Sequence, residues 1–418
     1  MKYRKLFKVL GPGLLYAGAA VGVSHLVQST RAGANYGFDL VWILILANII
    51  KYPFFEFAPR YASATGESLI EGYRKIGKWA VTLYALLTVA TMFTIQAAVT
   101  IVTAGIVGNV FGINLDSVSL SAIILLATMA VLMIGRYAIL DKLIKFVIII
   151  LASSTIVAVI FALNKGFNPN PETIQHFSWI NKLDIFFLIA FIGWMPAPID
   201  ITVWQSLWAN AKAKNLGFTP KLKDALLDFK IGYIGTAFLA VCFLTLGALV
   251  IYGSAEDLSP QGVVFADQLI NMFTSSIGSW AYLLIAIAAV TTMFSTTLTC
   301  LDAYPRVMKP LTLALFPKVK ILKSRFDWTT WFWIIVVASG ALILMSVLSS
   351  SMRSMVDIAT TLSFVTAPIL AFLNYKAVTN KEMPAKAKPR KWLQVYALIG
   401  IVFLSAFTVF YLIWKFIL

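Results

Sequence analysis

Long apolar runs recur along the whole chain and are separated by short clusters of polar residues. A membrane-spanning helix needs about 20 consecutive apolar residues, whereas barrel strands give short alternating segments, which we do not find here. Because lipid offers no partner to backbone N–H and C=O groups, each run is predicted to form a helix. The runs are centred near eleven residues: Ala19, Leu46, Ala97, Ala127, Ile150, Leu188, Leu239, Ile287, Val336, Phe364 and Leu404. The pattern predicts an all-α integral membrane protein with 11 transmembrane helices.

The composition agrees with this class. Of the 418 residues, 60% are hydrophobic and 12% charged, and the mean hydropathy is +0.85. A soluble protein of this size needs far more polar surface, so the apolar excess must face lipid. Cys242 and Cys300 both fall in predicted spans, which favours packing roles over a disulfide or a metal pair.

The net charge of +16 is distributed unevenly along the chain. If the N-terminus is cytoplasmic, 28 of the 34 Lys and Arg residues lie inside, in the arm with Lys2, Arg4, Lys5 and Lys8 and in segments near Lys75, Lys142, Lys221, Lys320 and Lys388. The outer loops hold mainly Lys165, Lys182 and Arg353. This bias predicts a plasma (inner) membrane protein with the N-terminus inside and the C-terminus outside. It also explains the basic charge without nucleic acid, so the expected partners are the lipid bilayer and a small-molecule or ion substrate.

Two spans contain residues that interrupt helices. The first has Gly11, Pro12, Gly13, Gly18 and Gly22, followed by Ser24, His25 and Gln28, and the sixth has Gly193, Met195, Pro196, Pro198 and Asp200. Pro196 and Pro198 remove backbone donors and clash with the preceding turn, so a continuous helix is not expected there. Paired breaks in corresponding spans are typical of transporters built from inverted repeats. We therefore expect helices 1 and 6 to be broken within a five-plus-five repeat: residues 1–165, residues 166–378, and an extra C-terminal helix over 379–418.

The segment GPGLLYAGAAVGVSHLVQSTRAGANYGFDLVWILILANI and the following RYASATGESLIEGYRK resemble the first two helices of the NRAMP divalent-metal transporters. The shared landmarks are Gly11-Pro12, Ala32-Gly33-Ala34, Tyr36-Gly37, Ala64-Thr65-Gly66, Leu69 and Glu71, with Met195-Pro196 in the sixth span. The resemblance implies a secondary transporter with the LeuT-type fold.

The sequence departs from that family where the metal would bind. The family's first helix is broken by Asp-Pro-Gly-Asn, and the corresponding positions here are Gly22, Val23, Ser24 and His25. Met92 and Gln96 stand where the family's third helix usually carries acids on the proton route. Ala197 and Pro198 replace the histidine expected after Met-Pro. The resemblance therefore implies a divergent member that lacks the metal-binding carboxylate.

A buried divalent ion needs compensating negative charge, and Asp200 is the one acid near both predicted breaks. The positive ends of half-helices favour anions instead. The primary hypothesis is therefore an NRAMP-like secondary transporter for a small anion such as bicarbonate, or a small polar solute, coupled to protons or another ion. The predicted substrate site comprises Gly22, Ser24, His25, Gln28, Met195 and Asp200, with His25, Asp200 and Gln96 in coupling. No catalytic residue, resident metal or cofactor is expected.

Several alternatives stay open. One is a divalent-cation transporter with a non-standard site, in which Met195, His25 and Asp200 would hold a borderline metal. Another is a non-transporting membrane sensor, which would be expected to carry a signalling domain. An enzyme is not expected, because His176, the other histidine, lies in an outer loop, and no nucleotide-binding motif indicates a pump.

Lys51 and Glu56 are predicted to form a structural pair or to lie near the inner boundary, and Arg31 to snorkel outward or to guard the outer vestibule. The oligomeric state is open and compatible with a monomer.

Overall fold

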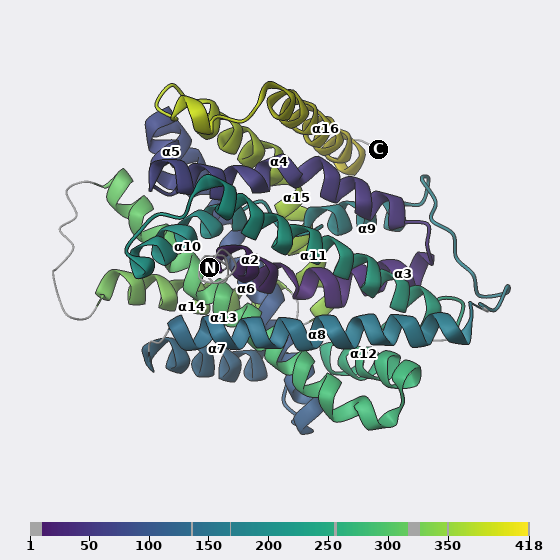
Figure 1. The fold of residues 1–418 in the computed structure, drawn as a ribbon. Coiled ribbons are helices and arrows are strands. Elements are labelled where there is room, and N and C mark those ends of the chain that lie inside the picture. The colour runs from purple at the N-terminus through teal and green to yellow at the C-terminus, as the bar shows by residue number, and fades with distance from the viewer. Residues whose placement is uncertain are drawn as a thin grey trace, which may run out of the picture.

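The computed structural model describes residues 11–134, 137–167, 169–254, 257–316, 327–348 and 351–416. The arm with Lys2, Arg4, Lys5 and Lys8, the residue Lys320 and the side chain of Lys142 lie outside the described set. Throughout the described ranges the regular structure is helical, without a strand (Figure 1). In chain order the elements are α2 (Pro12–Ala20), η1 (Ser24–Ser29), α3 (Thr30–Tyr36), α4 (Val41–Thr65), α5 (Leu69–Ile76), α6 (Lys78–Phe111), α7 (Ser117–Ile134), α8 (Tyr137–Lys165), α9 (Lys182–Gly193), α10 (Ile201–Leu216), α11 (Leu222–Val250), α12 (Gly262–Ile277), η2 (Ser279–Ala281), α13 (Tyr282–Leu315), α14 (Trp328–Leu348), α15 (Met352–Thr379), η3 (Ala385–Ala387) and α16 (Lys391–Phe416).

Each of the eleven predicted centres falls in one of these helices, and the all-α membrane class is confirmed. Within the described ranges, 8 helices are long and apolar enough to cross a bilayer: α4, α6, α7, α11, α13 with η2, α14, α15 and α16. The described apolar part of α8, Ile149–Lys165, is shorter. The first and sixth spans are each divided into two halves, as their glycines and prolines predict. The total of eleven spans stays a prediction.

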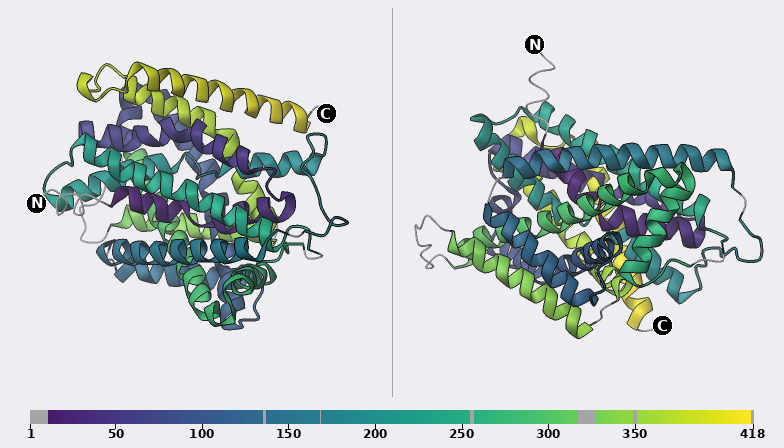
Figure 2. Two further views of the ribbon diagram at one scale, coloured as in Figure 1. Left: turned by 45° about the vertical axis from the view of Figure 1, so that its right-hand side comes forward. Right: turned by 90° about the horizontal axis from the view of Figure 1, so that it is seen from below.

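The helices form a bundle in which α6 is central and several others are peripheral (Figures 1 and 2). Of the most apolar 18-residue segment of α6, 72% of the residues are buried. In α7, α14 and α16 the corresponding share is 28%. The peripheral helices therefore present their apolar side chains to lipid. At one edge of the bundle, α16 packs on α15 and α4 (Figure 1).

Both halves of the first span pack on α11 at very short range. A side-chain carbon at Gly13 would lie 2.2 Å from the backbone oxygen of Asp228, and one at Gly33 would lie 1.9 Å from that of Leu244. Only glycine permits so close a crossing of two backbones. The glycines thus fix α2 and α3 against one helix, on either side of the break between them.

Candidate functional site

The first span is interrupted between α2 and η1. Helix α2 ends at Ala20, and Val21 and Gly22 are non-helical before the chain resumes as the π-helix η1. The backbone N–H groups of His25 and Leu26 both bond to the carbonyl of Gly22, at 3.1 and 2.9 Å. Short π-helical segments are uncommon and are frequent at functional sites.

The sixth span is interrupted over a longer stretch. Helix α9 ends at Gly193 and α10 begins at Ile201, and the Met195–Pro196 peptide bond between them is cis. Pro196 and Pro198 have no N–H group, so this stretch cannot form the ladder of a continuous helix. The predicted break in helix 6 is therefore present.

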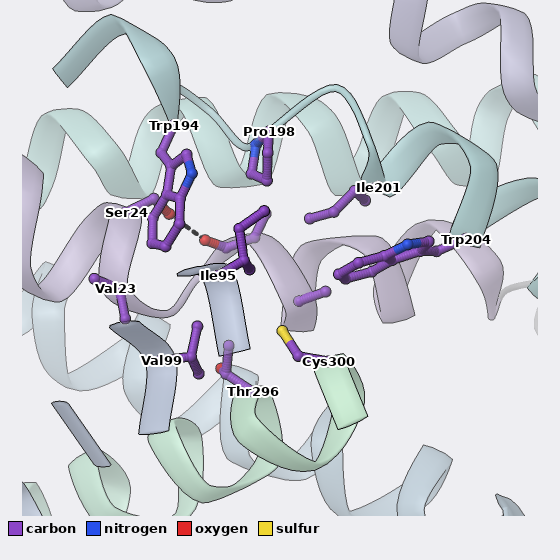
Figure 3. A pocket seen from close by; sticks show the side chains of 12 residues that line it. Val23, Ser24, Ile95, Val99, Trp194, Pro198, Ile201, Trp204, Thr296 and Cys300 are labelled. Atoms are coloured by element: carbon purple, nitrogen blue, oxygen red, sulfur yellow. Dashed lines mark hydrogen bonds between the residues drawn. The ribbon is translucent and has the colours of Figure 1, made fainter. Parts of the chain in front are cut away.

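The two breaks line a common pocket with α6 and α13 (Figure 3). Its free volume is about 20 Å³, enough for a single water molecule. Its lining residues carry the hydroxyls of Ser24 and Thr296, the thiol of Cys300 and the indole N–H groups of Trp194 and Trp204, and none of them is charged. The full lining is Ala19, Ala20, Val23, Ser24, Ile95, Val99, Trp194, Pro198, Ile201, Trp204, Thr296 and Cys300.

Gly22 lies directly against this pocket. A side-chain carbon built at Gly22 would lie 2.8 Å from both Oγ1 and Cγ2 of Thr296. Real side chains do not approach so closely, so the side chain of Thr296 fills the space into which a residue at position 22 would project. The resemblance places the family's metal-binding aspartate at this position. In this protein Thr296 leaves no room for an aspartate side chain, which is consistent with glycine at position 22.

His25 does not line the pocket but contacts it through Ser24. His25 Nδ1 lies 2.7 Å from Ser24 Oγ, and its Nε2 lies 2.9 Å from the carbonyl oxygen of Thr236 on α11. The Ser24 hydroxyl also reaches the carbonyl of Ala20 through a short hydrogen bond (Figure 3). With one proton, the hydroxyl can donate to Ala20 or to His25, but not to both at once. With Nδ1 protonated, the hydroxyl accepts from His25 and donates to Ala20, and with Nδ1 unprotonated it can donate to either.

Asp200 lies just before α10, is 2% exposed and also falls outside the pocket lining. Its Oδ1 has no hydrogen-bond partner within the described structure, and its Oδ2 receives only a long contact of 3.5 Å from the hydroxyl of Thr91. A buried carboxylate in this state is unsatisfied unless it holds a proton or a cation. The structure does not bring His25 and Asp200 into one cavity, because His25 faces α11 and Asp200 faces α6.

Gln28 belongs to a separate polar cluster next to the break. Its carbonyl accepts from Arg31 Nη1 at 2.9 Å, and its amide contacts Asp357 and Thr360 on α15 at 3.4 Å. Arg31 donates to both oxygens of Asp357, at 2.6 and 3.3 Å, and lies 5.0 Å from the ring of Phe187. This cluster joins α3 to α15. Arg31 is 5% exposed and does not snorkel outward.

The other predicted residues have mainly local partners. Gln96 on α6 donates to Thr100 Oγ1 at 3.1 Å, and its Oε1 has no partner within the described structure. The Met195 sulfur receives a contact from the Ser29 hydroxyl at 3.7 Å. Neither residue lines the pocket, although Gln96 is next to Ile95, which does. Roles for Gln96 and Met195 in transport stay predictions.

The predicted pair of Lys51 and Glu56 does not form, and a position near the inner boundary stays a prediction. Glu56 accepts a short salt bridge from Arg60 one helical turn further along α4. Lys51 is fully buried and donates to the carbonyl oxygens of Ile192 and Gly193 at 2.6 and 2.9 Å. The two side chains have different partners because Lys51 lies beside the break in the sixth span.

The donor set for a metal ion is sparse. In the part of the chain that the structure describes, no three His, Cys, Asp or Glu residues lie close enough to hold an ion. Cys242 and Cys300 are both free and buried, and they lie on different helices, α11 and α13. Cys300, but not Cys242, lines the pocket.

A helical bundle whose first and sixth spans break at a shared pocket defines a membrane transporter of the LeuT-type fold. Solved structures agree. A mutant of the Eremococcus coleocola manganese transporter aligns with a TM-score of 0.69 at 15% identity, covering 98% of this chain and 86% of that one. Mhp1, a nucleobase-cation-symport-1 family transporter in a closed conformation, aligns with a TM-score of 0.57 at 12% identity, covering 98% and 93%.

The sequence identifies the family. Residues 13–415 match the natural resistance-associated macrophage protein-like (Nramp) family, and the chain therefore belongs to it. An uncharacterized protein of Pasteurella multocida is 38% identical over 97% of this chain and 92% of its own length. The metal transporter Nramp3 of Oryza sativa is 24% identical over 77% of this chain and 60% of its own length. A divalent metal cation transporter MntH of Staphylococcus aureus is 25% identical over 61% of this chain and 58% of its own length. The protein is thus a multi-pass membrane transporter and not an enzyme.

Some residues at the site were not predicted from sequence. Thr296 and Cys300 are ordinary apolar-span residues, and nothing in the pattern of α13 distinguishes them. Trp194 and Trp204 also line the pocket, and neither was among the predicted site residues. Lys51 did carry a signal, because an ionisable residue inside a span is costly and usually has a function.

Proposed function

We propose that this Nramp-family protein is a secondary transporter that moves a small anion, such as bicarbonate, or a small polar solute by alternating access. One observation carries the proposal: the pocket between the broken helices has no carboxylate on its wall, and Thr296 fills the space next to Gly22. A divalent ion in a low-dielectric pocket needs negative ligands to compensate for lost hydration. A monoanion or a neutral solute needs only hydrogen-bond donors. The pocket offers Trp204 Nε1, which is unpaired in the described part of the chain, and the hydroxyls of Ser24 and Thr296, which here donate to the carbonyls of Ala20 and Thr292.

Coupling to protons is proposed to involve His25 and Asp200. The Ser24 hydroxyl lies on the pocket wall and exchanges between Ala20 and His25 as described above, so a proton on His25 changes what the pocket offers to a substrate. Asp200 is a second candidate, because its unpaired Oδ1 can hold a proton or a monovalent cation. Gln96, with an unpaired carbonyl next to the pocket, would be a hydrogen-bonding partner rather than a titrating group.

Reconstitution into liposomes tests both parts of the proposal. We expect uptake of radiolabelled bicarbonate that a pH gradient accelerates, and little uptake of Mn²⁺ or Mg²⁺. His25→Ala and Asp200→Asn should each reduce the response to the gradient, whereas Lys376→Met on the surface of α15 should not. Unchanged, gradient-dependent uptake in both variants would show that neither residue takes part in coupling.

The second candidate is transport of a divalent metal cation. It is favoured by the relatives, since the rice and Staphylococcus proteins are named as metal transporters. Asp200 and the Cys300 thiol would be the nearest ligands of a non-standard site, after a rearrangement that opens the closed pocket. Robust Mn²⁺ uptake that bicarbonate does not affect would establish this candidate and overturn the first.

The orientation and the repeat boundaries are part of the same proposal. The N-terminus would be cytoplasmic and the C-terminus outside, in the plasma membrane, with repeats over 1–165 and 166–378 and one further helix over 379–418. Support comes from the positions of the two breaks, one in each proposed repeat. A C-terminal alkaline phosphatase fusion should be active in the bacterial periplasm if this orientation holds, and a C-terminal fluorescent protein should not.

A further inference from the structure

Lys51 carries a charge that the proposed mechanism has not used. It lies in the middle of α4, and its side chain is 0% exposed. Its ammonium donates to the carbonyl oxygens of Ile192 and Gly193 at 2.6 and 2.9 Å, which are the last two residues of α9. The carbonyl of Ile192 also accepts from the backbone N–H of Met195 at 3.2 Å. The ammonium group therefore lies on the break in the sixth span itself.

No acid neutralises this ammonium in the described ranges. Its hydrogen bonds there are the two to backbone carbonyls, and none of the ion pairs found includes it. Asp200 is the nearest acid along the broken segment, and it contacts Thr91 rather than Lys51. The carbonyls at a helix C-terminus carry partial negative charge and stabilise a cation, but they do not cancel a full positive charge. When Lys51 is protonated, the break therefore has a net positive charge on its α4 side.

This charge is close to the pocket. Gly193, whose carbonyl accepts from the ammonium, directly precedes Trp194, which lines the pocket. Adjacent Cα atoms are about 3.8 Å apart, so the carbonyl that binds the ammonium belongs to the residue next to the pocket wall. In a low-dielectric interior the Lys51 ammonium attracts a nearby anion and repels a nearby cation strongly. It repels a divalent cation twice as strongly as a monovalent one.

We infer that Lys51 is a selectivity-determining residue, whose buried ammonium makes the pocket favour singly charged anions and reject cations without touching the substrate. The inference deepens the proposed function and rests on it for the identity of the favoured ion. A purely structural role is the alternative, in which the lysine only satisfies the two carbonyls that end α9. The two roles differ because one needs the positive charge and the other needs only the N–H donors.

Three substitutions separate charge from hydrogen bonding. Lys51→Arg keeps both the charge and the donors, Lys51→Gln keeps donors without charge, and Lys51→Met removes both. Each is reconstituted alongside Lys376→Met, which removes a charge from an exposed position on α15. Initial rates of uptake are measured for bicarbonate and for Mn²⁺ over a range of concentrations, after size-exclusion chromatography confirms that each variant is folded.

We expect Lys51→Gln and Lys51→Met to raise the KM for bicarbonate by about tenfold or more and to lower the KM for Mn²⁺ or permit its uptake, since one unit charge is lost near the pocket. Lys51→Arg and Lys376→Met should behave as the wild type. The inference is overturned if Lys51→Gln has the same KM as the wild type for both ions. It is also overturned if neither protein takes up either ion. If the wild type carries Mn²⁺ and not bicarbonate, the proposed function fails, but a lower KM for Mn²⁺ in Lys51→Gln would still support the role of the charge.

Discussion

At the scale of single residues, Gly22 and Thr296 form a complementary pair. The threonine side chain fills the volume that a larger residue at position 22 would need. A Cβ atom at position 22 would lie only 2.8 Å from Oγ1 and Cγ2 of Thr296. Restoring an aspartate at position 22 therefore does not simply restore a metal site. It creates both a steric conflict and a buried charge.

We predict that Gly22→Asp lowers the free energy of unfolding by about 1–3 kcal/mol, the usual cost of overpacking a closed interior. Adding Thr296→Ala, which removes both crowding atoms, should recover much of the loss and should increase Mn²⁺ binding relative to Gly22→Asp. Chemical denaturation in mixed micelles and Mn²⁺ titration measure the two effects. Thr296→Ala alone is the control, and equal stability of Gly22→Asp and the wild type would show that the pair is not sterically coupled.

The residue scale also shows what sequence reasoning could and could not find. Pro196 and Pro198 predicted the second break because a missing donor is a local property of the chain. The partner of Lys51 was not predictable, because it is a pair of backbone carbonyls 141 and 142 residues away. Asp200 and His25 were both expected in one cavity, but their side chains turn to different helices, and nothing in their spacing encodes that orientation.

At the scale of elements, the broken first span depends on its contacts with α11. The carboxylate of Asp228 accepts from the backbone N–H groups of Gly11 and Gly13 at 3.2 and 2.7 Å, so a neighbouring helix caps the start of α2. These N–H groups have no partner within α2. The close crossing at Gly13 is what brings the carboxylate within reach.

Gly13→Ala should therefore destabilise the protein by about 1–3 kcal/mol, because its side chain would overlap the backbone of Asp228, which cannot move aside cheaply. Gly235→Ala on α11 is a matched control. No atom lies within 4 Å of a side-chain carbon built there, so the change should be neutral or stabilising by about 0.5–1 kcal/mol. Unfolding of both variants in the same detergent compares them directly, and equal destabilisation would contradict the role of the crossing.

The other half of the first span is fastened to α15 by Arg31 and Asp357, whose side chains are 6% and 14% exposed. Asp357→Asn should cost about 3 kcal/mol, because it leaves the buried guanidinium without its counter-charge. The double variant Arg31→Met, Asp357→Leu should recover part of that loss, since it removes both charges. Chemical denaturation of these variants, with the single variants Arg31→Met and Asp357→Leu to complete a double-mutant cycle, gives these values.

The surface pair of Lys309 and Asp327, with side chains 33% and 44% exposed, provides the contrast for this cycle. Lys309→Met should cost no more than about 1 kcal/mol, because solvent screens an exposed pair. If Asp357→Asn cost as little as Lys309→Met, the buried cluster would contribute nothing to holding α3 against α15.

At the scale of the whole molecule, polar contacts fasten both halves of the first span to neighbouring helices. The cluster of Gln28, Arg31 and Asp357 joins α3 to α15 on one side, and Asp228 holds α2 to α11 on the other. The free volume of about 20 Å³ admits no solute larger than water. A larger substrate therefore requires the helices around the pocket to separate, and we expect one of these two contacts to open in that motion.

This requirement gives a prediction about motion. Gln28 on η1 and Thr360 on α15 are in contact at 3.4 Å, so cysteines at both positions can be joined by a short linker that forms a disulfide with each thiol. Joining them should abolish uptake and a reductant should restore it, because a linker that cannot lengthen keeps the pocket closed on that side. Lys309→Cys with Asp327→Cys, which connects a contact of 2.5 Å remote from the pocket, should leave uptake unchanged after linking. Each single cysteine variant controls for modification of Cys242 or Cys300. Full transport through the linked Gln28 and Thr360 pair would mean that α3 and α15 move as one body, and that access to the pocket arises from the α2 side alone.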